Sequence, residues 1–150
     1  MKAIAVFQNN LSGFVKFEQK DNALFVSGHI KGLNKNCEHA IHIHEYGDLS
    51  EGCTSACAHF NPFNKNHGGK DDKDRHVGDL GNIESDKKGE SKFKFLDHLI
   101  SLKNNKRNIL GRSVIIHEDP DDLGKGGFKD SLTTGHAGKR LDCAVIGLSK

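Results

Sequence analysis

Short segments in which apolar and polar residues alternate dominate the first part of the chain. The clearest cover residues 3–7, 13–17 and 23–27, with Gly, Asn and Asp residues between them that are typical of turns. Further segments rich in β-branched or aromatic residues cover 39–45, 81–84, 91–96, 112–117 and 143–148. No segment has a helical period. About eight short strands predict an all-β, antiparallel sandwich or barrel.

Two long polar stretches interrupt this pattern, at residues 46–79 and 118–141. Loops longer than about 12–15 residues in a compact domain are usually functional or disordered. We therefore expect the function to lie in two loops that are mounted on a rigid β scaffold.

Histidines gather in a pattern that a purely structural role does not explain. His42 and His44 flank an isoleucine in a strand-like run, where residues two apart share one face. A second β-rich run ends at His117. The first polar stretch carries the remaining candidate metal ligands, which are His59, His67, His76 and Asp79.

This set is too large for one tetrahedral ion and suits two ions, especially if one imidazole uses both of its ring nitrogens. Three imidazoles and one carboxylate in the polar stretch favour a closed zinc site. The other three imidazoles leave a position open, and all-nitrogen coordination favours copper(II). We expect His59 to bridge the two ions. The sequence has no His-Glu-x-x-His motif and no Gly-x-Ser-x-Gly motif, so it favours small-molecule redox chemistry over hydrolysis.

We expect the other four histidines to have roles other than metal binding. We expect His39 to lie beside a ligand, and we expect His29, His98 and His136 to face solvent or to be structural.

Composition limits the function classes further. A chain of 150 residues predicts one domain over 1–150, and 35% hydrophobic with 28% charged residues is typical of a folded, globular protein. The net charge of +2 gives little support for a nucleic-acid partner. No apolar run is long enough to span a membrane, and residues 1–10 do not resemble a signal peptide, so we expect a cytoplasmic location without membrane binding.

Four cysteines are present, at positions 37, 53, 57 and 143, and none forms a Cys-x-x-Cys pair. In a reducing compartment all four could be free thiols, and their positions alone do not decide between free thiols and a disulfide.

The chain resembles the copper/zinc superoxide dismutase family along nearly its whole length. The matching runs are Ala40-Ile41-His42-Ile43-His44-Glu45-Tyr46-Gly47-Asp48, Gly52-Cys53-Thr54-Ser55-Ala56, His59-Phe60-Asn61-Pro62, His67-Gly68-Gly69, Arg75-His76-Val77-Gly78-Asp79-Leu80-Gly81-Asn82, Asp121-Asp122-Leu123-Gly124-Lys125-Gly126-Gly127 and Gly138-Lys139-Arg140-Leu141-Asp142-Cys143. Together these runs are far more specific than a single His-x-His.

The resemblance implies a flattened, eight-stranded Greek-key barrel, related to immunoglobulin-like sandwiches, and two metal sites. The implied copper ligands are His42, His44, His59 and His117. The implied zinc ligands are His59, His67, His76 and Asp79. Asp121 would join a copper-ligand histidine to a zinc-ligand histidine, and Cys53 and Cys143 would form a disulfide.

The implied reaction converts superoxide to oxygen and hydrogen peroxide, for antioxidant defence, as copper alternates between Cu(II) and Cu(I). His59 and Arg140 would be the catalytic residues: His59 would pass a proton and Arg140 would bind the anion. The family also implies a homodimer, joined by an apolar patch that includes part of the disulfide loop.

Three departures from the family pattern carry their own expectations. Thr133 stands where the family usually has a lysine that attracts superoxide, so we expect steering to be weakened or rearranged. Cys57 stands where glycine is common. We expect it to be a small buried residue, free like Cys37, although it could compete with Cys53. Neither neighbour of Arg140 is proline, which is compatible with maturation without a dedicated copper chaperone.

Other classes fit less well. A copper-handling protein without turnover would tend to lose copper ligands, and a copper-only relative would lose zinc ligands. Neither loss occurs here. A cupin-like metal protein would require a different glycine spacing and would leave the cluster at 59–79 unexplained.

Overall fold

The predicted strands form, and a computed structural model describes all residues from Met1 to Lys150. The only helical segment is the short 3-10 turn η1 (Thr54–Ala56). The strands are β1 (Lys2–Phe7), β2 (Ser12–Gln19), β3 (Leu24–Lys31), β4 (Glu38–His44), β5 (Ser50–Cys53), β6 (Asp79–Glu84), β7 (Glu90–Asp97), β8 (Ser113–His117), β9 (Arg140–Val145) and β10 (Gly147–Ser149). The all-β prediction is confirmed.

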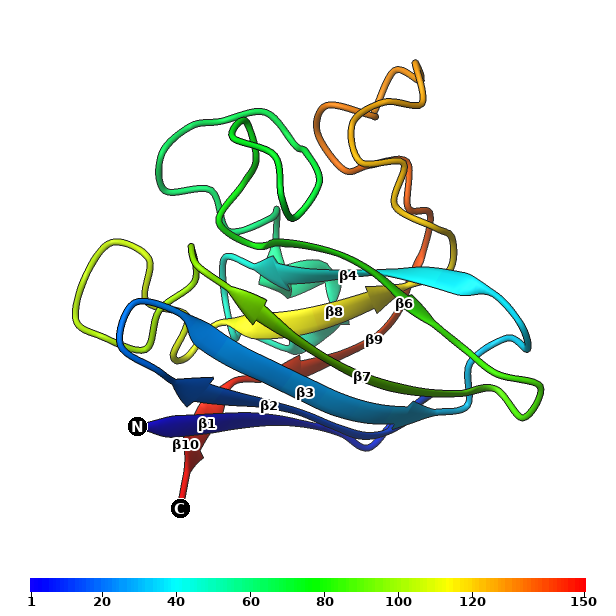
Figure 1. Ribbon diagram of the computed structural model, residues 1–150. Coiled ribbons are helices and arrows are strands. Elements are labelled where there is room, and N and C mark those ends of the chain that lie inside the picture. Colours follow the sequence, from blue (N-terminus) through cyan, green and yellow to red (C-terminus); the bar gives the residue numbers. More distant parts are fainter.

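Nine of these strands form two antiparallel sheets that pack face to face (Figure 1). One sheet has the order β10-β1-β2-β3-β7 and the other has the order β6-β4-β8-β9. The chain crosses between the sheets after β3, β6, β7 and β9, and such long connections are typical of Greek-key sandwiches. The backbone ladder does not close into a continuous barrel. The β1–β2 turn is instead joined to β9 where Asn10 Nδ2 donates to the Leu141 carbonyl (2.9 Å) and the Leu11 amide donates to Asp142 Oδ2 (3.0 Å).

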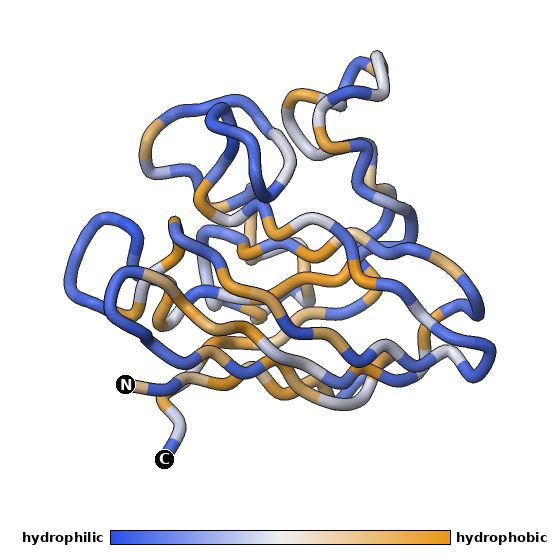
Figure 2. The backbone as a smooth tube through the Cα atoms, viewed as in Figure 1, coloured by the Kyte–Doolittle hydropathy of each residue, from blue (hydrophilic) through white to orange (hydrophobic).

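The core lies between the two sheets because each strand points alternate side chains inward. Its largest buried members include Phe7, Phe17, Leu24, Ile30 and Ile41. Figure 2 shows hydrophobic colouring along the strands and hydrophilic colouring in the projecting loops.

Two strand predictions need correction. The segment 143–148, expected as one strand, is divided between β9 and β10, which belong to different sheets. Ile146 lies between them and is buried, so the chain turns there to fill the core. In addition, β5 forms inside a stretch that was expected to be loop, which raises the strand count to ten.

Two long loops project from the same side of the sandwich (Figure 1). The first lies between β4 and β6, and the second between β8 and β9. Arg75 anchors the first loop to the opposite sheet: its buried guanidinium donates to Asp97 Oδ2 of β7 (2.8 Å) and to the Val77 carbonyl (2.9 Å). The structure has no helix with the length and apolar character needed to cross a membrane.

Candidate metal centre

Three of the candidate ligands lie on the two central strands of the four-stranded sheet. His42 and His44 are two residues apart on β4, so they share a face, and β8 pairs with β4 and ends at His117. A bridge between His44 and His59 brings the start of the first loop against β4. The apolar strands thereby place side chains that are 75 residues apart in sequence, His42 and His117, in one cluster.

The first cluster consists of four ring nitrogens that have no hydrogen-bond partner although they are buried. They are Nδ1 of His42 and Nε2 of His44, His59 and His117. The ligand atoms of these residues all lie within 4.8 Å of one another. A buried polar atom without a partner is costly, so four of them facing one point fit a metal ion.

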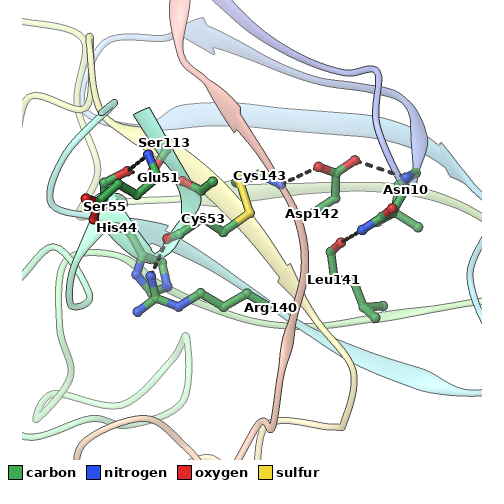
Figure 3. Close-up of a disulfide and its surroundings, with 12 residues drawn as sticks. Asn10, His44, Glu51, Cys53, Ser55, Ser113, Arg140, Leu141, Asp142 and Cys143 are labelled. Carbon is green, nitrogen blue, oxygen red and sulfur yellow. Dashed lines mark hydrogen bonds between the residues drawn. A yellow bond between two sulfur atoms is a disulfide. The ribbon is translucent and has the colours of Figure 1, made fainter. Parts of the chain in front are cut away.

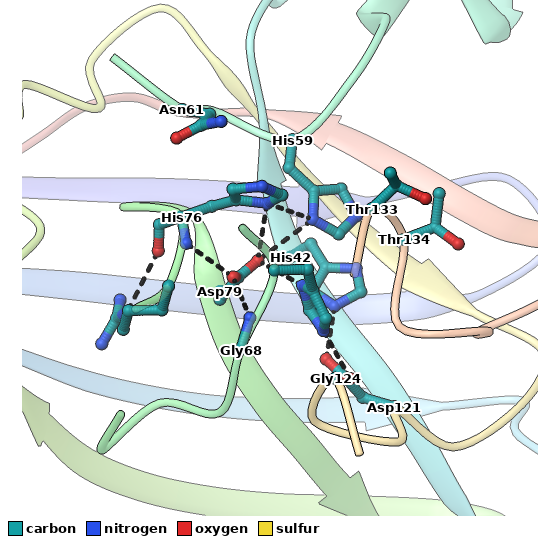
Figure 4. A network of polar contacts seen from close by, with 12 residues as sticks. His42, His59, Asn61, Gly68, His76, Asp79, Asp121, Gly124, Thr133 and Thr134 are labelled. Carbon is teal, nitrogen blue, oxygen red and sulfur yellow. Dashed lines mark hydrogen bonds and ion pairs between the residues drawn. The ribbon is translucent and has the colours of Figure 1, made fainter. Parts of the chain in front are cut away.

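In the second cluster, four separations between candidate ligand atoms fit a tetrahedral site. Asp79 Oδ1 lies 3.0 Å from His59 Nδ1, 2.9 Å from His67 Nδ1 and 3.3 Å from His76 Nδ1. His59 Nδ1 and His76 Nδ1 are 3.1 Å apart. Ligand atoms about 2.0 Å from a zinc ion at tetrahedral angles lie about 3.3 Å from one another. Figure 4 shows His59 and His76 meeting beside Asp79.

His59 belongs to both clusters. Its Nδ1 atom lies in the second cluster and its Nε2 atom in the first. A further group of ligand atoms within 4.8 Å of one another combines His42 with His59, His67 and Asp79, which shows that the clusters adjoin. The imidazole of His59 is therefore in the position that a bridge between two ions requires.

Asp121 hydrogen-bonds to one histidine ring of each cluster, at the ring nitrogen that faces away from the cluster. One carboxylate oxygen lies 2.7 Å from His42 Nε2 and the other 2.6 Å from His67 Nε2. These hydrogen bonds fix both rings so that their Nδ1 atoms face the clusters. Asn82 holds Asp121 in place: its Oδ1 accepts the Asp121 amide (2.7 Å) and its Nδ2 donates to the Asp121 carbonyl (3.0 Å). The sequence pattern alone gave no indication of the role of Asn82.

Gly135 is required beside this carboxylate. Its φ of 73° is favoured by glycine, and a Cβ atom there would lie 2.3 Å from Asp121 Oδ1 and 2.5 Å from His67 Nε2.

The titration of the imidazoles in the first cluster matches a metal-binding role. Burial lowers the pKa of His42 and His44 well below the usual value and lowers the pKa of His117 to about 4. These imidazoles are therefore neutral at pH 7, with lone pairs available to a metal. Burial opposes a charge on His67, but hydrogen bonds from the ring to Asp121 and Asp79 outweigh it and raise its pKa to about 9.

Arg140 lies at the edge of the first cluster, opposite His117 in the β8–β9 ladder. Its guanidinium donates to the carbonyls of Cys53 (2.6 Å) and Cys57 (2.5 Å). His44 Nδ1 contacts the same Cys57 carbonyl at 2.7 Å, so one backbone group positions both side chains. Burial lowers the pKa of Arg140 from its usual value, but the side chain stays charged at any physiological pH.

The implied disulfide is present. Cys53 and Cys143 are bonded, with their Cα atoms 5.7 Å apart, and the bond ties β5 to β9 beside Arg140 (Figure 3). Asp142 lies close to both sulfurs, but neither sulfur is a free thiolate that could bind a metal. Cys37 and Cys57 are free, as expected. The expectation that Cys57 is buried is wrong: it is exposed and has a φ of 61°, because the turn after η1 directs it outward.

The remaining histidines lie outside the clusters. His39 is buried and its Nδ1 contacts the His117 carbonyl at 2.9 Å, so it lies beside a candidate ligand as expected. His29 pairs with Glu90 (2.9 Å) and His136 with Asp130 (2.7 Å), whereas His98 is exposed.

Comparison with known proteins decides the family. Residues 11–146 match the family described as copper/zinc superoxide dismutase. A superoxide dismutase [Cu-Zn] of Paramecium bursaria Chlorella virus 1 is 53% identical over the whole chain and 80% of the relative. The chain belongs to the copper/zinc superoxide dismutase family.

Cellular relatives agree with this assignment. The Yarrowia lipolytica superoxide dismutase [Cu-Zn] is 50% identical, with 99% of each protein covered, and superoxide dismutase [Cu-Zn] A of Xenopus laevis is 51% identical, with 98% of this chain and 97% of the relative covered. A crystal structure of the clock protein EA4 matches with a TM-score of 0.95 and 45% identity, covering 99% of this chain and 94% of that chain. The protein is thus an enzyme that dismutates superoxide, and its cofactors are copper and zinc.

Proposed function

We propose that the two clusters divide the metals as the sequence predicts. His42, His44, His59 and His117 hold copper, supported by their unpartnered buried nitrogens. The zinc ligands are His59, His67, His76 and Asp79, supported by separations of 2.9–3.3 Å among their ligand atoms.

Copper, when bound, supplies the change between Cu(II) and Cu(I) by which one superoxide loses an electron and a second gains it. The chain supplies the remaining functions. Arg140 binds the anion, and its two backbone contacts fix the direction of the guanidinium. His59 Nε2 holds a proton when it is not a ligand and delivers it to the second superoxide. With one more proton from water, two superoxide ions give one oxygen and one hydrogen peroxide.

The main support for this proposal is the set of buried ring nitrogens without partners in the first cluster. Measuring copper and zinc content together with superoxide consumption tests it. We expect about one copper and one zinc per chain, together with consumption of superoxide. His44→Ala should lose copper and keep zinc, whereas His76→Ala should lose zinc first. A protein that binds both metals without turnover would be a metal-binding protein instead. Loss of the same metal from both variants would refute the division of ligands.

We propose further that the enzyme is a homodimer. Val145 on β9 and Leu148 on β10 are exposed, with 42% and 72% of their surfaces accessible. Val145 also lies against Gly47 of the first loop, so this apolar surface continues into the loop that contains the disulfide. Leu148→Glu should shift the sedimentation coefficient to that of a monomer, whereas Leu96→Glu on the exposed side of β7 should not. A wild-type monomer at micromolar concentration would contradict the dimer.

We also propose that the enzyme acts in the cytoplasm and acquires copper without a dedicated chaperone. Lys139 and Leu141, the neighbours of Arg140, support chaperone independence because neither is proline. Active enzyme from a host cell that lacks its own copper chaperone is the expected result. Inactive, zinc-only protein from that host would contradict it.

A further inference from the structure

A pocket of about 540 Å³ opens against the second cluster, and His59 and His76 are among the residues that line it. Arg140, His44 and His117 do not line this pocket. The pockets of about 990 Å³ and 390 Å³ elsewhere on the surface contain no candidate ligand. The 540 Å³ pocket therefore borders the cluster proposed for zinc without bordering the residue proposed to bind superoxide.

The four residues of the second cluster differ in how far solvent reaches them. The side chains of His67 and Asp79 are fully buried, whereas His59 has 3% and His76 has 8% of its side-chain surface accessible. Both accessible rings belong to the pocket lining. A ligand exchanges with water most easily where water already reaches it, so His76 is the point at which the cluster can open.

The wall that the first loop contributes to the pocket is held by hydrogen bonds. Asn61 Oδ1 accepts the Lys65 amide and Asn61 Nδ2 donates to the Lys65 carbonyl, each at 2.9 Å, so one side chain closes this turn. Arg112 also lines the pocket, and its guanidinium stacks on Phe60 at 3.7 Å. This wall can widen only if these contacts break.

The wall that the second loop contributes carries a side chain without such contacts. Leu132 and Thr133 line the pocket, and 52% of the Leu132 surface is accessible. Figure 4 shows Thr133 and Asn61 on different sides of the His59 ring. The Leu132 carbonyl accepts the His67 amide (2.9 Å), which fixes the backbone and leaves the leucine side chain at the rim. The size of this side chain therefore limits the width of the opening.

We propose that zinc enters and leaves the second cluster through this pocket, with His76 as the ligand that binds first and dissociates first. The inference rests on the proposed zinc ligands and deepens them by naming the route. An ion on this path meets His76 before it meets the buried side chains of His67 and Asp79. Because three of the four proposed copper ligands lie outside the lining, an obstruction in the pocket acts on zinc and not on copper.

The test measures zinc exchange in a variant that narrows the rim, Leu132→Trp. Release is followed from the copper- and zinc-loaded enzyme into an excess of a chromophoric chelator. Uptake is followed by stopped-flow mixing of the zinc-depleted enzyme with Zn²⁺. Leu132→Trp should slow both rates about three- to tenfold, because a narrower route raises the barrier in both directions. The zinc affinity and the copper content should not change, since neither end state is altered.

Leu96→Trp is the matched control. Leu96 is similarly exposed, at 50%, and lines the 390 Å³ pocket together with Arg75, the neighbour of His76 in the first loop. The same substitution there should leave both rates at the wild-type values. Asn61→Ala acts in the opposite direction: it frees the Lys65 turn, so both rates should rise.

Wild-type rates in Leu132→Trp would overturn the inference, as would equal slowing by Leu96→Trp or slower exchange in Asn61→Ala. A changed zinc affinity with an unchanged uptake rate in Leu132→Trp would also overturn it, because the side chain would then act on the bound site rather than on the route. Retention of zinc by His76→Ala would instead refute the proposed zinc ligands.

Discussion

Reduction of the Cys53–Cys143 disulfide should destabilise the metal-free chain more than any single surface contact could. The bond closes a loop with a sequence separation of 90 residues. In the chain-entropy model a loop of this size restricts the unfolded state by about 4–5 kcal/mol. The usual stability of a small domain is about 5–15 kcal/mol, so this contribution is a large part of the total.

Urea unfolding of the same chain, oxidised and reduced, measures the difference. Both samples should carry Cys37→Ser and Cys57→Ser so that no other thiol can exchange with the disulfide. Metals should be removed because they bind and stabilise the folded state. With a slope of about 2 kcal/mol per molar urea, the midpoint should fall by about 2 M on reduction. Protein concentration must be equal in both samples because the proposed dimer would also stabilise the fold.

A difference below about 1 kcal/mol would refute the argument, since it would mean that the loop hardly restricts the unfolded chain. A peptide map of the wild type that joins Cys57 to Cys143 would refute the pairing itself. Loss of activity on reduction, with stability retained, would indicate that the bond acts mainly by placing the Cys53 carbonyl against Arg140.

Three further outcomes follow from the site. Asp121→Asn should weaken zinc binding about 10–100-fold in a chelator competition, because it removes an acceptor behind two ligand rings; unchanged affinity would contradict this. Gly135→Ala should have a similar effect, because the new methyl group meets Asp121 and His67, and a structure with both hydrogen bonds intact would show that the loop adapts. Thr133→Lys should raise kcat/KM about two- to fivefold at low ionic strength only; a gain that persists at high salt would indicate a cause other than steering.

Most strands could be predicted because apolar and polar residues alternate along them. The runs that became β1 to β4 and β6 to β8 were recognised within a few residues of their ends. No apolar period marks β5, because Ser50–Cys53 is short, polar and mostly exposed. The break at Ile146 was missed because a buried residue between two sheets looks, in sequence, like the middle of one strand.

The candidate ligands were recognisable as a set, but the contacts that position their side chains were not. The sequence contains the histidines, yet only the fold decides which ring nitrogen faces which cluster. Asp121 was found through family resemblance alone, since one more aspartate in a Gly- and Asp-rich loop has no distinguishing pattern. The contact of Asn82 with Asp121 joins residues 39 positions apart, which no local pattern indicates.

The ion pair between Arg75 and Asp97 has a consequence for maturation of the enzyme. It attaches the ligand-bearing loop to the far sheet by protein contacts alone, and Asp97 is itself held by the Leu99 and Ile100 amides. We therefore expect a newly synthesised chain to meet zinc with this part of the loop already held against the sheet. Less ordering then remains for the ion to impose, so capture should be rapid.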